Sequence, residues 1–294
     1  MIDKLEMFIS LAREQHFGRA AERMGITQPS LSAGIKQLET QLGVQLVWRG
    51  SRYGGLTPEG QRVLIWARQI VGDTRAMRDE MRAVRQGLAG ELRLAVIPTA
   101  LTLAADLTAR FTRAHPNAGV TILSRTSAEI LSMLDNLEID AGLSYLDNDP
   151  LGRVTTLPLY HERYVALCHV DHPLNDGATW ADLAAHPLCL LTPDMQNRRI
   201  INQNFAAADA NPRAMIQSNS TIVLMAHVET GDWVTVLPTR QAEFLCTGKP
   251  VRMIPLPDLR PAPSVGLIAP FREPHTPVLA ALLAQAASLS ELPG

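Results

Sequence analysis

The sequence has few aromatic residues and few cysteines, and it contains no long apolar run. Aromatic residues make up 5% of the 294 residues, and the three cysteines (Cys168, Cys189 and Cys246) lie far apart without a CxxC pair. Cysteines in this number and spacing fit neither a disulfide framework nor a zinc site, so we expect small, reduced core residues. No apolar run approaches the ~20 residues that cross a bilayer, and the start MIDKLEMF has no signal-peptide core. The sequence predicts a cytoplasmic protein without membrane contact.

The sequence also lacks the short motifs of common catalytic sites. It contains no GxGxxG, GxxxxGK[ST], GxSxG or HExxH. After His161-Glu162, Val165 stands where a second zinc-binding histidine would be needed. His169 and His172 flank the end of a predicted strand, and we interpret them as turn or surface residues. We therefore expect no enzyme activity, no metal site and no cofactor.

The composition predicts a packed protein of about two domains with an uneven charge distribution. Hydrophobic residues make up 46% and charged residues 19%, a balance typical of folded proteins. Residues 1–90 hold 13 Lys and Arg against 9 Asp and Glu, a net charge of +4, whereas the remainder holds 14 against 20, a net charge of −6. A basic head on an acidic body suggests nucleic-acid binding, with ordinary surface variation as the alternative.

The first sixty residues have the periodicity of three short helices. The second helix should end at Gly25, and the third should begin after Thr27, carry Pro29 in its first turn and end at Gly43. Apolar residues recur at helical spacing on one face of each helix. These inward positions are Leu5, Phe8, Ile9 and Ala12, then Phe17, Ala20, Ala21 and Met24, then Leu31, Ile35, Leu38 and Leu42.

The opposite face of the third helix predicts DNA binding. Its residues are short and polar, so they can approach base edges in a major groove, while Lys36 and Arg19 can meet phosphates. That face is made of Gln28, Ser30, Ser32, Ala33, Lys36, Gln37 and Thr40. The following VQLVWR strand, SRYGG loop and return strand at Leu56 predict a wing, in which Arg49 and Arg52 reach the DNA backbone or minor groove. The alternative is a three-helix module without a DNA role.

The motifs AAERMGITQPSLS, QLETQLG and LTPEG match, in order and spacing, the N-terminal domain of LysR-type transcriptional regulators, which this chain resembles. The chain departs from the family at Val47, where Phe is usual, and at Ala33, where Arg or Gln is common. The resemblance implies that double-stranded operator DNA is a partner, with RNA polymerase as another. The predicted DNA-binding residues are Arg19, Thr27, Gln28, Pro29, Ser30, Ser32, Lys36, Arg49 and Arg52, of which the resemblance puts Gln28, Pro29, Ser30 and Ser32 on the bases.

A heptad pattern follows and predicts a long helix over residues 58–89, capped by Thr57 with Pro58 in its first turn. At about 1.5 Å per residue this helix is about 45 Å long, too long for one small domain to cover. We expect a second chain against it, the alternative being a helix that lies on its own protein. The resemblance implies pairing through this helix and dimers of dimers. The predicted dimerisation residues are Val63, Ala67, Ile70, Met77, Met81 and Val84.

Residues 90–294 alternate strands and helices and predict two α/β lobes with a mainly parallel sheet. Strands are expected at ELRLAVI, VTILS and AGLSY, and Thr126 with Glu129 forms a capping box. A second run begins at RYVALCH, and VGLIA should return to the first lobe. The resemblance implies a periplasmic-binding-protein-like effector domain. The predicted domains are a winged helix-turn-helix (1–57), a linker helix (58–89) and an effector domain (90–294), with lobe I at 90–161 and 266–294 and lobe II at 162–265.

Helix N-termini that follow the strands predict a ligand site. Hydroxyls and free N–H groups at Pro98-Thr99, Thr126-Ser127 and Ser218–Thr221 should meet at the carboxyl ends of the strands, although plain N-capping explains each one alone. The resemblance implies a pocket at Thr99, Ala100, Thr126 and Ser127. The predicted effector residues are Pro98, Thr99, Ala100, Thr126, Ser127, Asn197, Arg198 and Ser220.

We therefore predict a transcription regulator modulated by a small anionic metabolite, a carboxylate or an inorganic oxyanion, because helix N-termini favour negative charge and aromatic residues are scarce. Two alternatives from other classes stay open. A constitutive DNA-binding protein needs no two-lobed cleft, and a solute-binding or enzymatic α/β protein needs no winged head or heptad.

Overall fold

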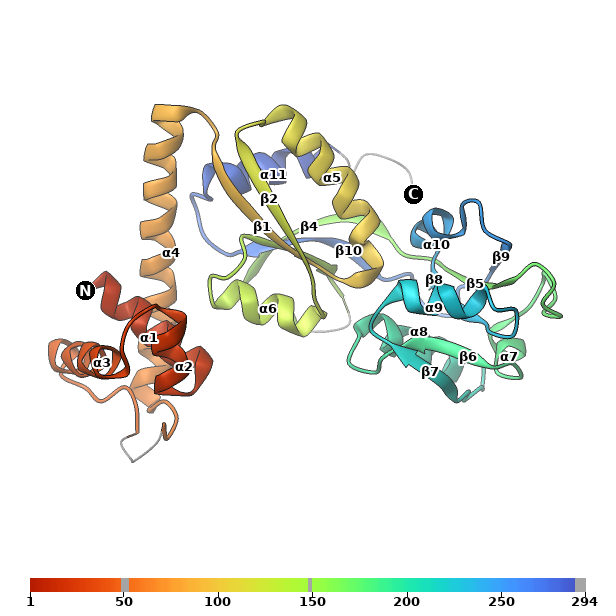
Figure 1. Ribbon diagram of the computed structural model, residues 1–294, viewed down its shortest axis with the longest axis horizontal. Coiled ribbons are helices and arrows are strands. Elements are labelled where there is room, and N and C mark those ends of the chain that lie inside the picture. Colours follow the sequence, from red (N-terminus) through yellow and green to blue (C-terminus); the bar gives the residue numbers. More distant parts are fainter. Residues whose placement is uncertain (49–52, 148–149, 289–294) are drawn as a thin grey trace. The chain divides into compact units, whose positions relative to one another are not determined.

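The structure is a computed structural model that describes residues 1–48, 53–147 and 150–288. Its chain forms two compact units (Figure 1). Unit 1 consists of Met1–Gly87 with Asp135–Glu138 and Pro274–Pro277, and unit 2 consists of Leu88–Leu134, Ile139–Glu273 and Val278–Gly294.

Unit 1 is built from four helices whose ends follow local capping signals. They are α1 (Ile2–Glu14), α2 (Phe17–Arg23), α3 (Gln28–Leu42) and α4 (Pro58–Gln86). The Thr27 hydroxyl accepts the Ser30 N–H at the start of α3, and Gly43 ends that helix in the left-handed conformation with φ 72°. The core of these helices is Leu5, Phe8, Ile9, Leu11, Ala20, Ala21, Leu31, Ile35, Leu38, Leu46, Val47, Ala67 and Val71. The prediction that Leu42 belongs to this core is wrong, because its side chain is 39% exposed.

Among the described residues, the expected wing is present as an antiparallel bridge between Val47 and Leu56. The Thr57 N–H donates to the Leu46 carbonyl, and the Thr57 hydroxyl donates to the Gln45 carbonyl at 2.6 Å. The base of the hairpin is therefore tied to the first turn of α4. The predicted tip residues Arg49 and Arg52 lie outside the described residues.

Helix α4 has 29 residues and is about 44 Å long at 1.5 Å per residue. Its first half packs on α1 through Ala67 and Val71, so only part of the predicted heptad seam faces outward. Ala67 is fully buried within its own chain. It cannot contact a second chain, and its prediction as a dimerisation residue is wrong.

Lobe I of unit 2 is a five-stranded sheet in the order β2-β1-β3-β10-β4. Strands β1, β2 and β3 are parallel, and β10 is antiparallel to both β3 and β4, so the predicted return of the late strand is observed. Figure 1 shows α5 and α6 on opposite sides of this sheet. The elements are β1 (Gly90–Val96), η1 (Pro98–Ala100), α5 (Leu101–Ala114), β2 (Ala118–Ser124), α6 (Ser127–Asp135), β3 (Ala141–Tyr145), β4 (Val154–His161), β10 (Ser264–Pro270) and α11 (Pro277–Ala287).

Lobe II contains an antiparallel sheet in the order β8-β5-β9 and a parallel pair, β6-β7. The chain passes from lobe I to lobe II between β4 and β5, and it returns between β9 and β10. Its elements are β5 (Tyr164–His169), α7 (Trp180–Leu183), β6 (Leu188–Leu191), α8 (Gln196–Ala207), β7 (Ala214–Ser218), α9 (Thr221–Val228), β8 (Thr235–Pro238), α10 (Thr239–Cys246) and β9 (Val251–Pro255). Two crossing segments therefore connect the lobes.

Candidate DNA interface and effector site

The outer face of α3 is exposed and polar. Six of the predicted DNA-binding residues lie on it or at its start, and all six are exposed. They are Thr27, Gln28, Pro29, Ser30 and Ser32, with Lys36 one turn further along. The Thr27 and Ser30 hydroxyls are 2.8 Å apart and form the N-terminal cap. The side chains of Gln28, Ser32 and Lys36 therefore form the part of this face that capping does not use.

Arg19 lies near this surface but has partners within its own chain. Its guanidinium donates to the Glu14 carbonyl at 2.7 Å and lies 3.9 Å from the Glu14 carboxylate. The side chain is 61% exposed, so this ion pair is weakened by solvent. A phosphate can therefore compete with Glu14 for the Arg19 guanidinium.

Glu39 positions the wing, a role that no sequence motif indicated. Its carboxylate is buried, and its Oε1 accepts the N–H groups of Leu46 and Val47 at 2.9 and 3.4 Å. These bonds hold the first wing segment against the C-terminal half of α3. The available signal was a charged residue beside the apolar positions of a helix, which needs buried donors as partners.

From Ile70 to its end, α4 presents apolar side chains outward. Ile70, Met77, Met81 and Val84 are exposed, Val84 by 78%, and they are spaced at 7, 4 and 3 residues. Val63, also predicted to pair chains, is only partly buried and packs against the core of unit 1. Residues at this spacing lie on one face of the helix, and an apolar face of this kind is suited to packing against a second helix.

In unit 2, the predicted effector residues of lobe I lie where β1 and β2 end. Pro98, Thr99 and Ala100 form the buried turn η1, and Ser127 begins α6. The parallel register pairs Val96 with Ser124, so the segments that follow both strands leave the same edge of the sheet. The turn η1 and the start of α6 therefore follow neighbouring strands at one edge of the sheet.

Asn197 of lobe II reaches the same turn through a tyrosine of lobe I. Its Nδ2 donates to the Tyr145 hydroxyl at 3.1 Å, and the Thr99 hydroxyl lies 3.4 Å from that same oxygen. Tyr145 ends β3 and is completely buried. The three side chains therefore form one hydrogen-bonded chain between the lobes.

Tyr145 in turn donates to a buried carboxyl that the sequence analysis had considered only for zinc. Glu162 lies between β4 and β5, and its carboxyl accepts from Tyr145 at 2.6 Å, Tyr164 at 2.9 Å and Tyr160 at 3.5 Å. Desolvation raises the Glu162 pKa to about 7, although the three tyrosine bonds oppose the shift. Burial and the adjacent carboxyl also raise the Tyr145 pKa well above 10.

Gln241 of α10 is a further residue that the sequence analysis missed. Its Nε2 donates to the Pro98 carbonyl at 2.9 Å and to the Thr221 hydroxyl at 3.2 Å, across 143 residues of sequence in the first case. Gln241 is buried, so these bonds satisfy its donor group inside the protein. No sequence motif marks it, because its partner is a main-chain carbonyl of the other lobe.

Three predicted effector residues have other roles in this structure. Thr126 forms the expected capping box, accepting the Glu129 N–H and donating its own N–H to the Glu129 carboxylate. Ser220 is half-buried, and its N–H donates to the Ser218 hydroxyl. Thr126 therefore has the capping role considered as the plain alternative, whereas the Ser220 side chain forms no cap hydrogen bond at the start of α9.

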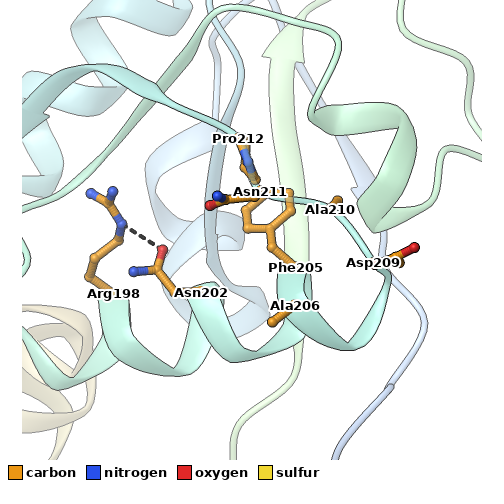
Figure 2. A pocket seen from close by; sticks show the side chains of 8 residues that line it. All are labelled: Arg198, Asn202, Phe205, Ala206, Asp209, Ala210, Asn211 and Pro212. Atoms are coloured by element: carbon orange, nitrogen blue, oxygen red, sulfur yellow. Dashed lines mark hydrogen bonds between the residues drawn. The ribbon is translucent and has the colours of Figure 1, made fainter.

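Arg198 is the third predicted effector residue with another role. Its hydrogen bonds do not involve Thr99, Tyr145 or Asn197. Its guanidinium donates to the Leu191 carbonyl at 2.7 Å. It also donates to the Asn202 side-chain oxygen at 2.9 Å, the bond drawn in Figure 2. It lines a separate pocket of about 410 Å³ together with Asn202, Phe205, Ala206, Asp209, Ala210, Asn211 and Pro212. Arg198 therefore does not join the cluster that contains Thr99 and Asn197.

The cysteines do not provide reactive thiols. Cys168 and Cys189 are buried and Cys246 is half-buried, and burial raises the pKa of all three thiols, that of Cys189 to about 12. Among the described residues, no group of three or more His, Cys, Asp or Glu side chains is placed to hold a metal ion. No helix within residues 1–48, 53–147 and 150–288 has the length and apolar character needed to span a membrane.

A helix-turn-helix head followed by a two-lobed α/β domain defines a ligand-responsive transcription regulator. Comparison with known families agrees: residues 2–61 match the "bacterial regulatory helix-turn-helix protein, lysR family", and residues 85–290 match the "LysR substrate binding domain". The chain belongs to the LysR family of transcriptional regulators, which is not a family of enzymes. The predicted fold class is confirmed.

Similar proteins are regulators as well. The SDS degradation transcriptional activation protein of Pseudomonas sp. (strain ATCC 19151) is 33% identical over 80% of this chain and 78% of its own length. XapR of Escherichia coli (strain K12), an HTH-type transcriptional regulator, is 32% identical, and the match spans 60% of each protein. Among solved structures, a full-length OxyR variant from Pseudomonas aeruginosa has a TM-score of 0.73 at 26% identity, covering 97% of this chain and 94% of that one.

Proposed function

We propose that this protein is a dimeric repressor or activator of the bacterial cytoplasm that binds operator DNA through α3 and responds to a small-molecule effector held between the lobes of unit 2. The observation that carries the proposal is the chain of buried polar groups that links Thr99, Tyr145 and Asn197 across the lobes. A DNA-binding protein without an effector has no need of such a chain, since buried polar groups cost stability unless they are paired.

The DNA contact is proposed at the exposed face of α3. Gln28 and Ser32 would contact base edges, with Pro29 and Ser30 beside them and Thr27 at the helix start. Short polar side chains suit the major groove, where base edges carry the sequence information. Lys36 and Arg19 would contact phosphates, as would Arg49 and Arg52, which lie outside the described residues.

Self-association is proposed through the exposed face of α4. Ile70, Met77, Met81 and Val84 are apolar and exposed, and a second copy of the same helix would cover them. A two-fold dimer places two α3 helices on one pseudo-palindromic operator. Pairs of dimers and a contact with RNA polymerase belong to the same proposal.

The effector is proposed to be a small anion at the end of β1 and β2, contacted by Pro98, Thr99, Ala100 and Ser127 from lobe I. Ser127 begins α6, where helix N–H groups favour negative charge, and its buried hydroxyl oxygen has no hydrogen-bond partner in the part of the chain that the structure describes. Asn197 would contact the effector from lobe II. Thr126, Arg198 and Ser220 would act indirectly, through the positions of α6, α8 and α9.

The test is capture of fragmented genomic DNA by the full-length protein, with and without an extract of small metabolites. Wild-type protein should enrich a defined operator, and the extract should change the enrichment. The Ser32→Glu variant should bind the operator more than about tenfold more weakly, because its carboxylate would face electronegative groove edges and phosphates. Ser288→Glu, the same change at an exposed position at the end of α11, should keep it.

Thr99→Val separates the two halves of the proposal. It removes the hydroxyl beside Tyr145 with little change in shape, so the operator should be retained and the response to extract reduced. Unchanged operator affinity in Ser32→Glu would show that α3 is not the recognition helix. An undiminished response in Thr99→Val would reject the inter-lobe effector site.

A further inference from the structure

Two amide side chains of lobe II leave oxygen acceptors buried without a partner in the protein. Asn197 and Gln241 are each 3% exposed, and among the described residues no group donates a hydrogen bond to Asn197 Oδ1 or to Gln241 Oε1. Both side chains are linked to the turn η1 by hydrogen bonds. Gln241 donates directly to the Pro98 carbonyl, whereas Asn197 donates to the Tyr145 hydroxyl, which lies beside Thr99. A buried acceptor without a donor is costly, so a ligand that donates a hydrogen bond to either oxygen gains binding free energy there.

The orientation of the Gln241 amide is set by its neighbours. Nε2 donates to the Pro98 carbonyl at 2.9 Å and to the Thr221 hydroxyl at 3.2 Å. A carbonyl oxygen can only accept, so a rotated amide would place two acceptors against each other at Pro98. Gln241 Oε1 is therefore the group that stays available.

The orientation of the Asn197 amide follows from the buried carboxyl. The Tyr145 hydroxyl has one proton and donates it to Glu162 Oε2 at 2.6 Å, so its oxygen accepts from Asn197 Nδ2. Asn197 must present its nitrogen to Tyr145 and its oxygen elsewhere. Glu162 is thus a positioning residue for Asn197, acting through Tyr145.

We propose that the effector carries hydrogen-bond donors, from an ammonium, amide or hydroxyl group, which it presents to the Asn197 and Gln241 side-chain oxygens. This inference rests on the inter-lobe effector site proposed above and names its chemical class. The effector is also expected to place a carboxylate at Ser127 and the start of α6. The two requirements together favour small amino or hydroxy acids. Simple carboxylates and inorganic oxyanions lack the donors that the two amide oxygens require.

The test compares acids that differ by one donor group. Malate and aspartate are each measured against succinate, and lactate against propionate, by calorimetry and thermal shift on the full-length protein. Within each pair that binds, the hydroxy or amino acid should bind about tenfold more tightly, the effect of one hydrogen bond to an otherwise unpaired acceptor. Equal affinity within every pair would overturn the inference, as would the absence of binding by all of these acids.

Matched variants test whether the preference for the acid with the extra donor group depends on Asn197 and Gln241. Asn197→Leu and Gln241→Met keep side-chain size and remove the acceptors, so each should reduce the preference within a pair several-fold. Gln196→Met is the control: it also removes a buried amide that bonds lobe I, at the Asp147 carbonyl, but its oxygen is not among the buried unpartnered atoms. Gln196→Met should keep the preference.

The outcomes distinguish this inference from the proposed function. If Asn197→Leu and Gln241→Met leave the preference intact while Thr99→Val weakens binding of both acids in a pair, the site stands and the donor inference falls. If Thr99→Val changes the binding of no acid, the inter-lobe site itself is wrong. Operator binding by each variant verifies that the protein is folded.

Discussion

At the scale of single residues, Glu162 is the group on which both lobes of unit 2 depend. Tyr145 and Tyr160 reach its carboxyl from lobe I and Tyr164 from lobe II, and it is 2% exposed. Two further charges bear on this cluster. Asp147 raises the Glu162 pKa, and the Arg240 guanidinium lies 5.8 Å from the centre of the Tyr160 ring. A carboxyl enclosed by three hydroxyl donors is tolerated in a buried position, but its ionised form is still costly.

The raised pKa predicts a pH-dependent stability. Because folding raises the Glu162 pKa from 4.5 to about 7, the folded state binds its proton more tightly than the unfolded state. This contribution to the free energy of unfolding is complete below pH 4.5 and is lost as the pH rises through 7. At about 1.4 kcal/mol per pKa unit, the rise from 4.5 to about 7 amounts to at most about 3.5 kcal/mol.

Urea unfolding of wild-type protein and Glu162→Gln at pH 5 and pH 8 measures this contribution. The wild type should lose more stability than the variant between the two pH values. Glu243→Gln, at an exposed position on α10, should behave as the wild type. An identical pH dependence in wild type and Glu162→Gln would mean that the carboxyl does not titrate in this range.

Gly60 is a second residue whose importance comes from a close approach. A Cβ atom at this position would lie 2.1 Å from the Leu46 carbonyl oxygen, at the point where the wing meets the first turn of α4. Alanine normally favours a helix by about 1 kcal/mol over glycine. At Gly60 the clash should reverse the sign.

We expect Gly60→Ala to destabilise unit 1 by about 1–3 kcal/mol, the usual cost of overpacking. Thermal unfolding and operator binding measure the effect, and both should decrease. Gly119→Ala is the control, because its Cβ would meet only the Gly90 carbonyl at 3.9 Å. A Gly60→Ala protein more stable than the wild type would show that the hairpin moves aside at no cost.

At the scale of elements, α4 combines two functions along its length. Its first half completes the core of unit 1 through Ala67 and Val71, and its second half exposes Met77, Met81 and Val84. A helix that is apolar on an outward face favours association with another helix. The dimer should therefore depend on the second half of α4.

Met77→Asp combined with Met81→Asp should dissociate the dimer. Two carboxylates in an apolar interface cost several kcal/mol when no partner neutralises them. Light scattering at micromolar concentration should give the mass of a monomer for this variant. Arg78→Asp with Arg82→Asp places carboxylates at the same spacing on exposed polar positions of α4 and should remain dimeric. A dimeric Met77→Asp, Met81→Asp protein would reject this face as the interface.

At the scale of the whole molecule, the charge distribution and the dimer together predict the salt dependence of operator binding. Residues 1–90 carry a net charge of +4 although the complete chain carries −2, so the attraction to DNA is concentrated in the head. Each phosphate contact contributes about 0.9 to the slope of log K against log salt concentration. A dimer makes each contact twice.

Lys36→Ala should therefore reduce that slope by about 1.8 if both heads are bound, and by about 0.9 if only one is bound. Operator titrations between low and high salt measure the slope directly. The same titration with Glu243→Gln, remote in sequence from the head, should leave the slope unchanged. An unchanged slope in Lys36→Ala would mean that this lysine contacts no phosphate.

The sequence alone determined the features that depend on neighbours in the chain. Thr27 and Gly43 bound α3, and Thr126 with Glu129 caps α6, because helix ends are stabilised by groups within a few residues. The polar outer face of α3 and the spacing along α4 follow from helical periodicity. The family motifs around residues 20–60 predicted the regulator class for the same reason, since they are contiguous in sequence.

Only the tertiary structure decided which distant groups meet. Gln241 bonds Pro98 across 143 residues, Asn197 shares Tyr145 with Thr99, and Glu162 collects tyrosines from both lobes. Arg198 looked equivalent to Asn197 in sequence, yet its side chain lines a pocket with Asn202 and Phe205, whereas Asn197 bonds Tyr145 (Figure 2). Ala67 fits the heptad, but packing on α1 buries it in its own chain. Periodicity gives the direction of a side chain relative to its own helix. Which residue it contacts on that side depends on the distant segment that the tertiary structure places there.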